Sequence, residues 1–148
     1  MILSKHVIVK AIILILSTIA IAGLVILEDL HRLNNDFERL YSLLRTARLD
    51  AFYENTTIIV RFNGTVVTVN KQNNLKSMTT TAIPTITKVD YDTVTGKNTI
   101  VYDMHGTSRY NKRIHGGEIM LKSMLGFKKY LHVNCNGVVM EGRYPEEK

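Results

Sequence analysis

The fold is set by residues 7–27, which read VIVKAIILILSTIAIAGLVIL. Only Lys10, Ser17, Thr18 and Gly23 interrupt this apolar run. Residues 11–27 alone form a helix of about 26 Å at about 1.5 Å per residue, and residues 7–9 extend it to the thickness of a bilayer core. The run therefore predicts a membrane-spanning helix. Its membrane contacts are expected from Ala11, Leu14, Leu16, Ile19, Gly23 and Leu27.

Charges on the two sides of the apolar run predict its orientation. Lys5 and Lys10 lie toward one end, and Glu28 and Asp29 follow the other. Because Lys and Arg beside a span favour the cytoplasmic side, the N-terminus is expected in the cytoplasm and the rest of the chain outside. An alternative is a cleaved secretory signal, since residues 20–22 read Ala-Ile-Ala. Continuation of the apolar run beyond that site argues against cleavage, because it would leave an exposed apolar N-terminus.

The segment after the span stays helical in pattern but becomes amphipathic. Its apolar residues recur at alternating steps of three and four and so share one stripe of a helix: Leu30, Leu33, Phe37, Leu40, Leu44, Ala47 and Ala51. The opposite face is polar and is expected to be solvated: Arg32, Asn35, Asp36, Arg39, Ser42, Thr46 and Asp50. A coiled coil is the alternative, but only about three heptads are present. We expect the stripe from Leu33 to Ala51 to pack on a sheet, and the helix to end near Asn55 in a left-handed conformation.

The remaining chain is predicted to form one α+β domain. Of 148 residues, residues 1–28 form the membrane half of the helix and residues 29–148 an external domain, with helix 29–54, sheet 56–142 and a flexible tail 143–148. The single Cys135 has no partner for a disulfide within the chain, and we interpret it as a small buried apolar residue. The core must therefore hold the domain together.

About seven short antiparallel strands are expected in this domain. The strongest signal is Asn63-Gly64 between two β-branched runs, which predicts a hairpin with both turn residues at positive φ. Further along, we expect a loop at 71–77, a strand at 78–90 with Pro84 at an edge or bulge, and a turn at Thr95-Gly96. A strand at 99–104, a surface loop at 105–117 and strands at 118–121 and 128–133 follow. A turn at 134–137 then leads into a last strand at 138–140.

Residue patterns that carry chemistry are lacking. The sequence holds no nucleophile elbow, phosphate loop or dinucleotide fingerprint. Its histidines have no metal-ligand spacing, although His105 and His115 share one predicted loop and leave a metal site as an alternative. We expect no enzyme activity, no cofactor and no small-molecule substrate.

Two groups of residues resemble a known family. The first is the helix end and first strand: Leu40, Leu43, Leu44, an Ala-Arg-x-x-Ala pattern from Ala47-Arg48 to Ala51, Asn55, Ile58 and Val60. The second closes the chain: Ile100-Val101-Tyr102, Gly106-Thr107-Ser108, residues 117–121, Leu131-His132-Val133-Asn134 and Gly137-Val138-Val139. Together they resemble the type IV pilin-like superfamily and, within it, minor pseudopilins of the GspH/FimT type. The resemblance covers nearly the whole chain through loose patterns of small and apolar residues.

The sequence departs from that family at its start. Family members begin with a leader that ends in Gly and is cleaved before a Phe-Thr-Leu-x-Glu-like start, whose Glu serves subunit recruitment. Here no Gly precedes the apolar run, and no acidic residue lies between Met1 and Leu27. Leader cleavage and N-methylation are therefore not indicated by the sequence.

The resemblance implies a structural subunit of a type II secretion or type IV pilus-like machine, held in the bacterial inner membrane and assembling with other pilin-like subunits. The residues expected to contact the membrane would then also make the filament contacts. DNA contact is an alternative. Residues 1–30 hold two of the 19 Lys and Arg residues and two of the 13 acidic ones, so the net charge of +6 belongs to the rest of the chain. Candidate DNA contacts are Arg109, Lys112, Arg113, Lys128, Lys129 and Arg143, with Tyr110 and Tyr130 for stacking. A membrane-anchored β-domain unrelated to pilins is the third possibility.

Overall fold

The computed structural model describes residues 3–72, 74–90, 92–93, 96–108, 118–134 and 136–143. Within them lie one α-helix and ten β-strands. Their bounds are α1 Leu3–Tyr53, β1 Ile58–Asn63, β2 Val66–Lys71, β3 Asn74–Ala82, β4 Ile86–Asp90, β5 Asp92–Thr93, β6 Gly96–Lys97, β7 Thr99–Tyr102, β8 Glu118–Lys122, β9 Lys128–Val133 and β10 Val139–Glu141.

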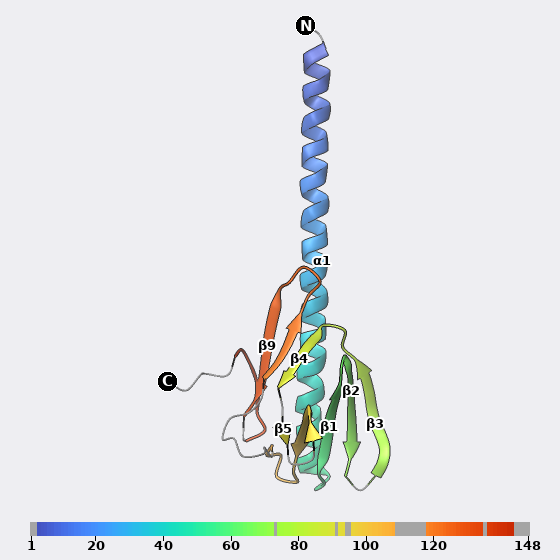
Figure 1. Ribbon diagram of the computed structural model, residues 1–148, viewed down its shortest axis with the longest axis vertical. Helices are drawn as coiled ribbons and strands as arrows, with labels where there is room; N and C mark the ends of the chain where they lie inside the picture. The colour runs from blue at the N-terminus through green and yellow to red at the C-terminus, as the bar shows by residue number, and fades with distance from the viewer. Residues whose placement is uncertain are drawn as a thin grey trace.

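Helix α1 is a single element of 51 residues with two unlike halves. Its first half stands free of the rest of the chain, and its second half lies along the sheets (Figure 1). The helix ends at Tyr53, and Asn55 then takes a φ of 51° while the Thr56 amide donates to the Ala51 carbonyl at 3.1 Å. The predicted left-handed Asn55 is confirmed, and the turn satisfies a carbonyl that the helix itself leaves unpaired.

Two four-stranded antiparallel sheets form the domain. Their strand orders are β3-β2-β1-β7 and β10-β9-β8-β4, and β5 and β6 make a separate pair. Both sheets lie beside the second half of α1 (Figure 1). The apolar side chains of the helix and of the inner sheet faces form one core cluster, which includes Leu40, Leu44, Val60, Ile100 and Leu121 at 0% exposure. The predicted α+β class, a long helix on antiparallel strands, is confirmed.

The first hairpin forms with a different turn from the one predicted. Asn63 pairs with Val66, so the two turn residues are Gly64 and Thr65 rather than Asn63 and Gly64. Among them only Gly64 has a positive φ, at 60°. A glycine at the first turn position is the pattern of a type II′ turn, which fits the strand twist as a type I′ turn does.

Two other predictions for this region are wrong. The segment 71–77 is not a loop, because β2 runs to Lys71 and β3 already begins at Asn74. The predicted strand 78–90 is two strands: β3 ends at Ala82, and β4 begins at Ile86 in the other sheet. Pro84 lies in the crossing between them, where its missing N–H breaks no sheet ladder. This division and the small β5–β6 pair raise the strand number from the expected seven or so to ten.

The closing strands lie close to their predicted places. Strands β8 and β9 pair antiparallel, and Gly126 in the turn between them has a φ of 95°. Strand β10 pairs with β9 after the turn at Asn134 to Gly137. The predictions for the loop beyond Ser108, the tail after Arg143, Cys135 and the exact Thr95 turn concern residues outside the described ones.

Candidate membrane anchor and assembly surface

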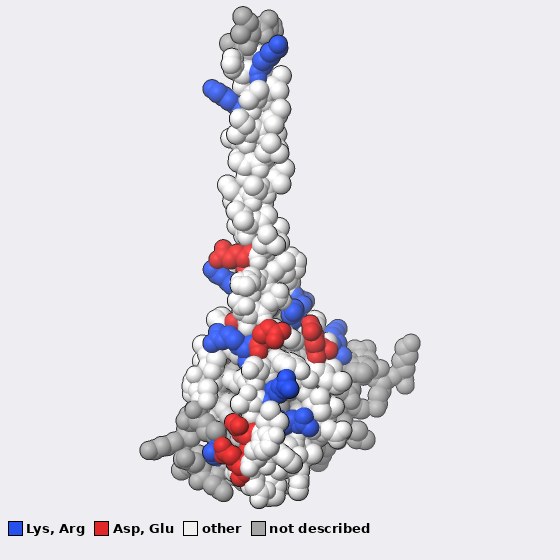
Figure 2. Space-filling model, turned by 180° about the vertical axis from the view of Figure 1, so that it is seen from behind, with Lys and Arg blue, Asp and Glu red and all other residues white. Residues whose placement is uncertain are grey.

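The first half of α1 is an apolar column with no protein packed on it. Every residue from Ser4 to Glu28 is exposed, and the large apolar side chains among them are 42–67% exposed. Figure 2 shows an uncharged surface between the lysines near the N-terminus and the charged residues where the domain begins. Among the described residues, this helix alone is long and apolar enough to cross a membrane. Exposed apolar area on this scale needs a lipid or protein partner.

The residues predicted for membrane or filament contact all lie on this column. Leu14, Leu16, Ile19 and Leu27 are 61–67% exposed, and Ala11 is exposed as well. A Cβ added at Gly23 would meet nothing within 4 Å, so the glycine leaves a shallow place on the column that no part of the described chain fills.

The two hydroxyl groups in the column are satisfied within the helix. Ser17 Oγ donates to the Leu14 carbonyl at 2.9 Å, and Thr18 Oγ1 donates to the same carbonyl at 2.7 Å. A hydroxyl that bonds to its own helix does not cost the free energy of an unpaired polar group in hydrocarbon. These residues therefore do not oppose insertion of the column into a bilayer.

The second half of α1 packs through the predicted stripe. Its side chains are 0–3% exposed and join the core cluster: Leu33, Phe37, Leu40, Leu44, Ala47 and Ala51. Leu30, one turn earlier, is only half-buried. The change from an exposed column to a packed helix thus takes place within about one turn of residue 29.

One residue of the predicted polar face is buried rather than solvated. Asp36 is 9% exposed, and its carboxylate accepts bonds from the Thr85 amide at 3.2 Å and the Thr85 hydroxyl at 2.8 Å. Arg39 lies 3.8 Å from the same carboxylate. Asp36 therefore attaches α1 to the crossing between β3 and β4. Helical periodicity could not reveal this contact, because the crossing approaches the helix from its polar side.

Asp29 joins the helix to the β8–β9 turn at the start of the packed half. It is 8% exposed, and its two carboxylate oxygens accept bonds from the Met124 amide at 3.1 Å and the Leu125 amide at 3.2 Å. A side-chain hydrogen bond from Ser123, opposed by partial desolvation and aided by those two amides, lowers the pKa of Asp29. In the sequence Asp29 indicates only the membrane orientation, and no local pattern predicts this contact.

Three residues from the family-like patterns meet at the far end of the helix. Arg48 Nε donates to the Gly106 carbonyl at 3.0 Å. Gly137 lies against that same carbonyl, since a Cβ at Gly137 would come within 2.1 Å of the Gly106 oxygen. The Asp103 carboxylate shapes the neighbouring turn by accepting bonds from His105 N, Thr107 N and Thr107 Oγ1 at 2.9, 3.0 and 2.6 Å. These three residues thus hold the turn at Gly106 and the turn at Gly137 against α1.

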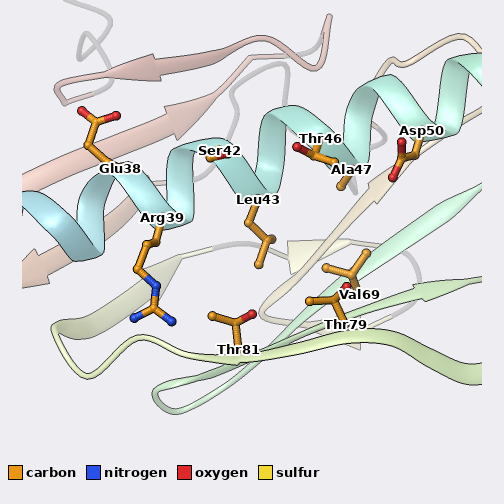
Figure 3. A pocket seen from close by; sticks show the side chains of 10 residues that line it. All are labelled: Glu38, Arg39, Ser42, Leu43, Thr46, Ala47, Asp50, Val69, Thr79 and Thr81. Atoms are coloured by element: carbon orange, nitrogen blue, oxygen red, sulfur yellow. The ribbon is translucent and has the colours of Figure 1, made fainter.

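A groove of about 520 Å³ runs between α1 and strands β2 and β3. Figure 3 shows Leu43 and Arg39 extending from the helix toward Thr81, with Val69 and Thr79 beyond them. Its lining combines the charged side chains of Glu38, Arg39 and Asp50 with small polar and apolar ones. Across the described residues, no group of three or more His, Cys, Asp or Glu side chains is placed to hold a metal ion.

The candidate DNA-contacting residues are only partly placed by the structure. Arg109, Lys112, Arg113 and Tyr110 lie outside the described residues, whereas Lys128, Lys129 and Arg143 lie in or next to the second sheet. Lys129 is 3.6 Å from Glu141 and its Nζ lies 4.7 Å from the Phe37 ring centroid. Arg143 is 3.6 Å from Glu118 and covers the Tyr130 ring at 5.0 Å. These contacts occupy two of the three cations and one face of the tyrosine, so they do not favour DNA binding.

Known proteins with a similar architecture are found by structure and not by sequence. No protein-family model matches the sequence, and no curated protein matches it significantly. Two crystal structures of the type IV minor pilin FimU of Pseudomonas aeruginosa are similar to it, with TM-scores of 0.57 and 0.55. The chain has a type IV pilin-like fold. The matches cover 74% and 76% of this chain and 92% and 90% of FimU, at 13% and 11% sequence identity. At that identity the likeness concerns the pilin-like fold and not the role of individual residues.

Proposed function

We propose that this pilin-like chain is a minor structural subunit of a type II secretion or type IV pilus-like envelope machine. The observation that carries the proposal is the apolar column of residues 4–28, which continues as one helix into the pilin-like domain. Such a column has two ways to lose its contact with water: insertion in a bilayer, or packing against similar helices of other subunits. A subunit with both options can be stored in the membrane and later enter a filament.

In this proposal residues 1–28 span the bacterial inner membrane and residues 29–148 lie on its outer side. Lys5 and Lys10 near the N-terminus and Glu28 and Asp29 after the column support a cytoplasmic N-terminus. Residues 7–27 form a helix of about 31 Å, which matches a hydrocarbon core of about 30 Å. The domain then presents its sheets to partner subunits, and its role is structural rather than enzymatic.

A substitution in the column tests the anchor. Leu16→Asp places a carboxylate near the middle of the span, where an acidic residue costs about 3 kcal/mol on insertion scales. We expect this variant to be lost from carbonate-washed membranes, whereas Leu49→Asp should remain, since Leu49 lies on the same helix but beside the domain and is 42% exposed. The anchor is refuted if Leu16→Asp fractionates with membranes as the unmodified chain does.

The intact mass of the membrane-extracted protein tests how the subunit is processed. A chain shortened by a few residues and carrying a methyl group supports ordinary pilin processing despite the unusual start. Full-length mass supports a permanently anchored accessory subunit. Removal of the column as a signal peptide contradicts the proposal, because the remaining domain has neither anchor nor assembly helix.

A further inference from the structure

The turn between β8 and β9 exposes three large apolar side chains at one end of the domain. Met124 is 88% exposed, Leu125 52% and Phe127 40%. In Figure 1 this turn is the part of the domain nearest to the free half of α1. Leu49, Phe52 and Tyr53, near the C-terminal end of α1, are also exposed, at 42–77%, whereas Met104 and Met140 are exposed singly. This concentration needs an explanation, because the turn has no apolar partner in the described structure.

The turn is rigid and fixed to the helix. Ser123 N donates to the Phe127 carbonyl at 2.8 Å, Phe127 N donates to Ser123 Oγ at 3.0 Å, and Gly126 N donates to the Ser123 carbonyl at 3.1 Å. From the helix, the Asp29 carboxylate binds the amides of Met124 and Leu125. The backbone N–H groups of residues 124–127 are thus all bonded, and the exposed apolar side chains form the outward surface of the turn.

This attachment places the turn at the expected edge of the membrane. Asp29 follows Leu27, the last apolar residue of the column, by about 3 Å along the helix axis. The polar interface of a bilayer is about 5–8 Å thick on each side of its hydrocarbon core. A turn held at Asp29 therefore lies inside that interface whenever residues 7–27 fill the core.

Two lysines at the base of the turn favour an anionic neighbour. Lys122 and Lys128 are exposed and directly opposite each other in the β8–β9 register. Like charges in opposed positions repel, and within the described residues neither lysine forms an ion pair, in contrast to Lys129 with Glu141. An anionic group between them would remove the repulsion.

We propose that residues 124–127 enter the membrane interface beside the helix, with Lys122 and Lys128 on the phosphates of anionic lipids. Apolar side chains nearer the hydrocarbon core and lysines farther from it match the inner and outer layers of that interface. The inference rests on the proposed membrane anchor. It adds a second contact that fixes the orientation of the domain on the bilayer before assembly. A neighbouring subunit is the competing partner for the turn, but an apolar turn with two exposed lysines at its base fits lipid better at this depth.

Tryptophan fluorescence tests the proposal directly, because the chain contains no Trp. Full-length Met124→Trp, Leu16→Trp and Phe52→Trp are each reconstituted in vesicles of phosphatidylcholine and phosphatidylglycerol, with or without brominated acyl chains as quenchers. Phe52 is 57% exposed and lies about 35 Å along α1 from Asp29, which makes it the matched control. We expect quenching of Met124→Trp several-fold above Phe52→Trp and below Leu16→Trp.

The three reporters separate the two claims. If Leu16→Trp is quenched and Met124→Trp behaves as Phe52→Trp does, the interface contact is overturned and the anchor stands. If Leu16→Trp is not quenched, the anchor itself fails. If the emission of Met124→Trp is blue-shifted but not quenched by brominated chains, and shifts to the red on dilution of protein in lipid, the turn contacts a second subunit and the lipid contact is overturned.

A charge variant tests the lysines. In the Met124→Trp chain, Lys122→Gln with Lys128→Gln should remove the increase in quenching that phosphatidylglycerol gives over phosphatidylcholine alone. Lys88→Gln, an exposed lysine on β4, serves as the charge control and should leave that increase in place. An unchanged dependence on phosphatidylglycerol in the double variant refutes the role of the lysines.

Discussion

Replacing Gly137 with Ala should destabilise the domain more than its φ alone predicts. Gly137 has a φ of 78°, which costs about 1–2 kcal/mol for a residue with a Cβ. The new Cβ would also lie 2.1 Å from the Gly106 carbonyl oxygen, the acceptor of the Arg48 bond. Moving one loop to relieve that overlap adds about 1–3 kcal/mol, the usual cost of overpacking. The total is about 2–5 kcal/mol.

Gly64→Ala is the matched control for this prediction. Its φ is 60°, but a Cβ there meets nothing within 4 Å, so only the backbone cost of about 1–2 kcal/mol applies. Thermal unfolding of both variants, followed by the far-ultraviolet circular dichroism of the sheets in mild detergent, measures the difference. At about 3–5 °C per kcal/mol for a domain of this size, Gly137→Ala should unfold at least about 3 °C below Gly64→Ala. Equal melting temperatures would refute the close packing of the two loops on α1.

The remaining predictions concern the helix. Leu40→Ala removes a fully buried side chain and should lower the free energy of unfolding, measured in urea, by about 2–5 kcal/mol. Leu49→Ala, at an exposed site, should change it by no more than about 0.5 kcal/mol. Similar losses in the two variants would contradict packing through the stripe. Because the folded-state pKa of Asp29 is lowered, its stabilisation is complete above the ordinary Asp pKa of about 4 and is lost as pH falls through the folded value. Asp29→Asn should remove that acid-dependent part of the free energy of unfolding. If the variant and the unmodified chain lose stability in parallel as the pH falls, Asp29 does not cause the dependence.

Sequence periodicity was sufficient for the helix and much of the sheet. Apolar steps of three and four identify the buried stripe because a helix that packs on a sheet exposes only one face to it. The Asn63-Gly64 pair located the first hairpin, although its turn is one residue further on than predicted. That shift depends on which turn matches the strand register, and residue preferences alone do not decide it.

Contacts between segments far apart in the chain could not be predicted. Asp29 binds amides 95 and 96 residues away, and Asp36 binds Thr85 across 49 residues. Both aspartates look like ordinary solvated residues in a helical pattern, and only the path of the chain brings backbone donors to them. The crossing at Pro84 was missed for a related reason: the alternation of β-branched residues continues through it, although the chain changes sheets there.

Protease accessibility in right-side-out membrane vesicles tests whether α1 anchors the chain with its domain outside. Protease added outside should digest the domain and leave a protected membrane fragment that contains the apolar column of residues 4–28. A full-length chain that resists digestion until the vesicles are opened would contradict the proposed orientation. A chain that carbonate releases intact would contradict the anchor itself.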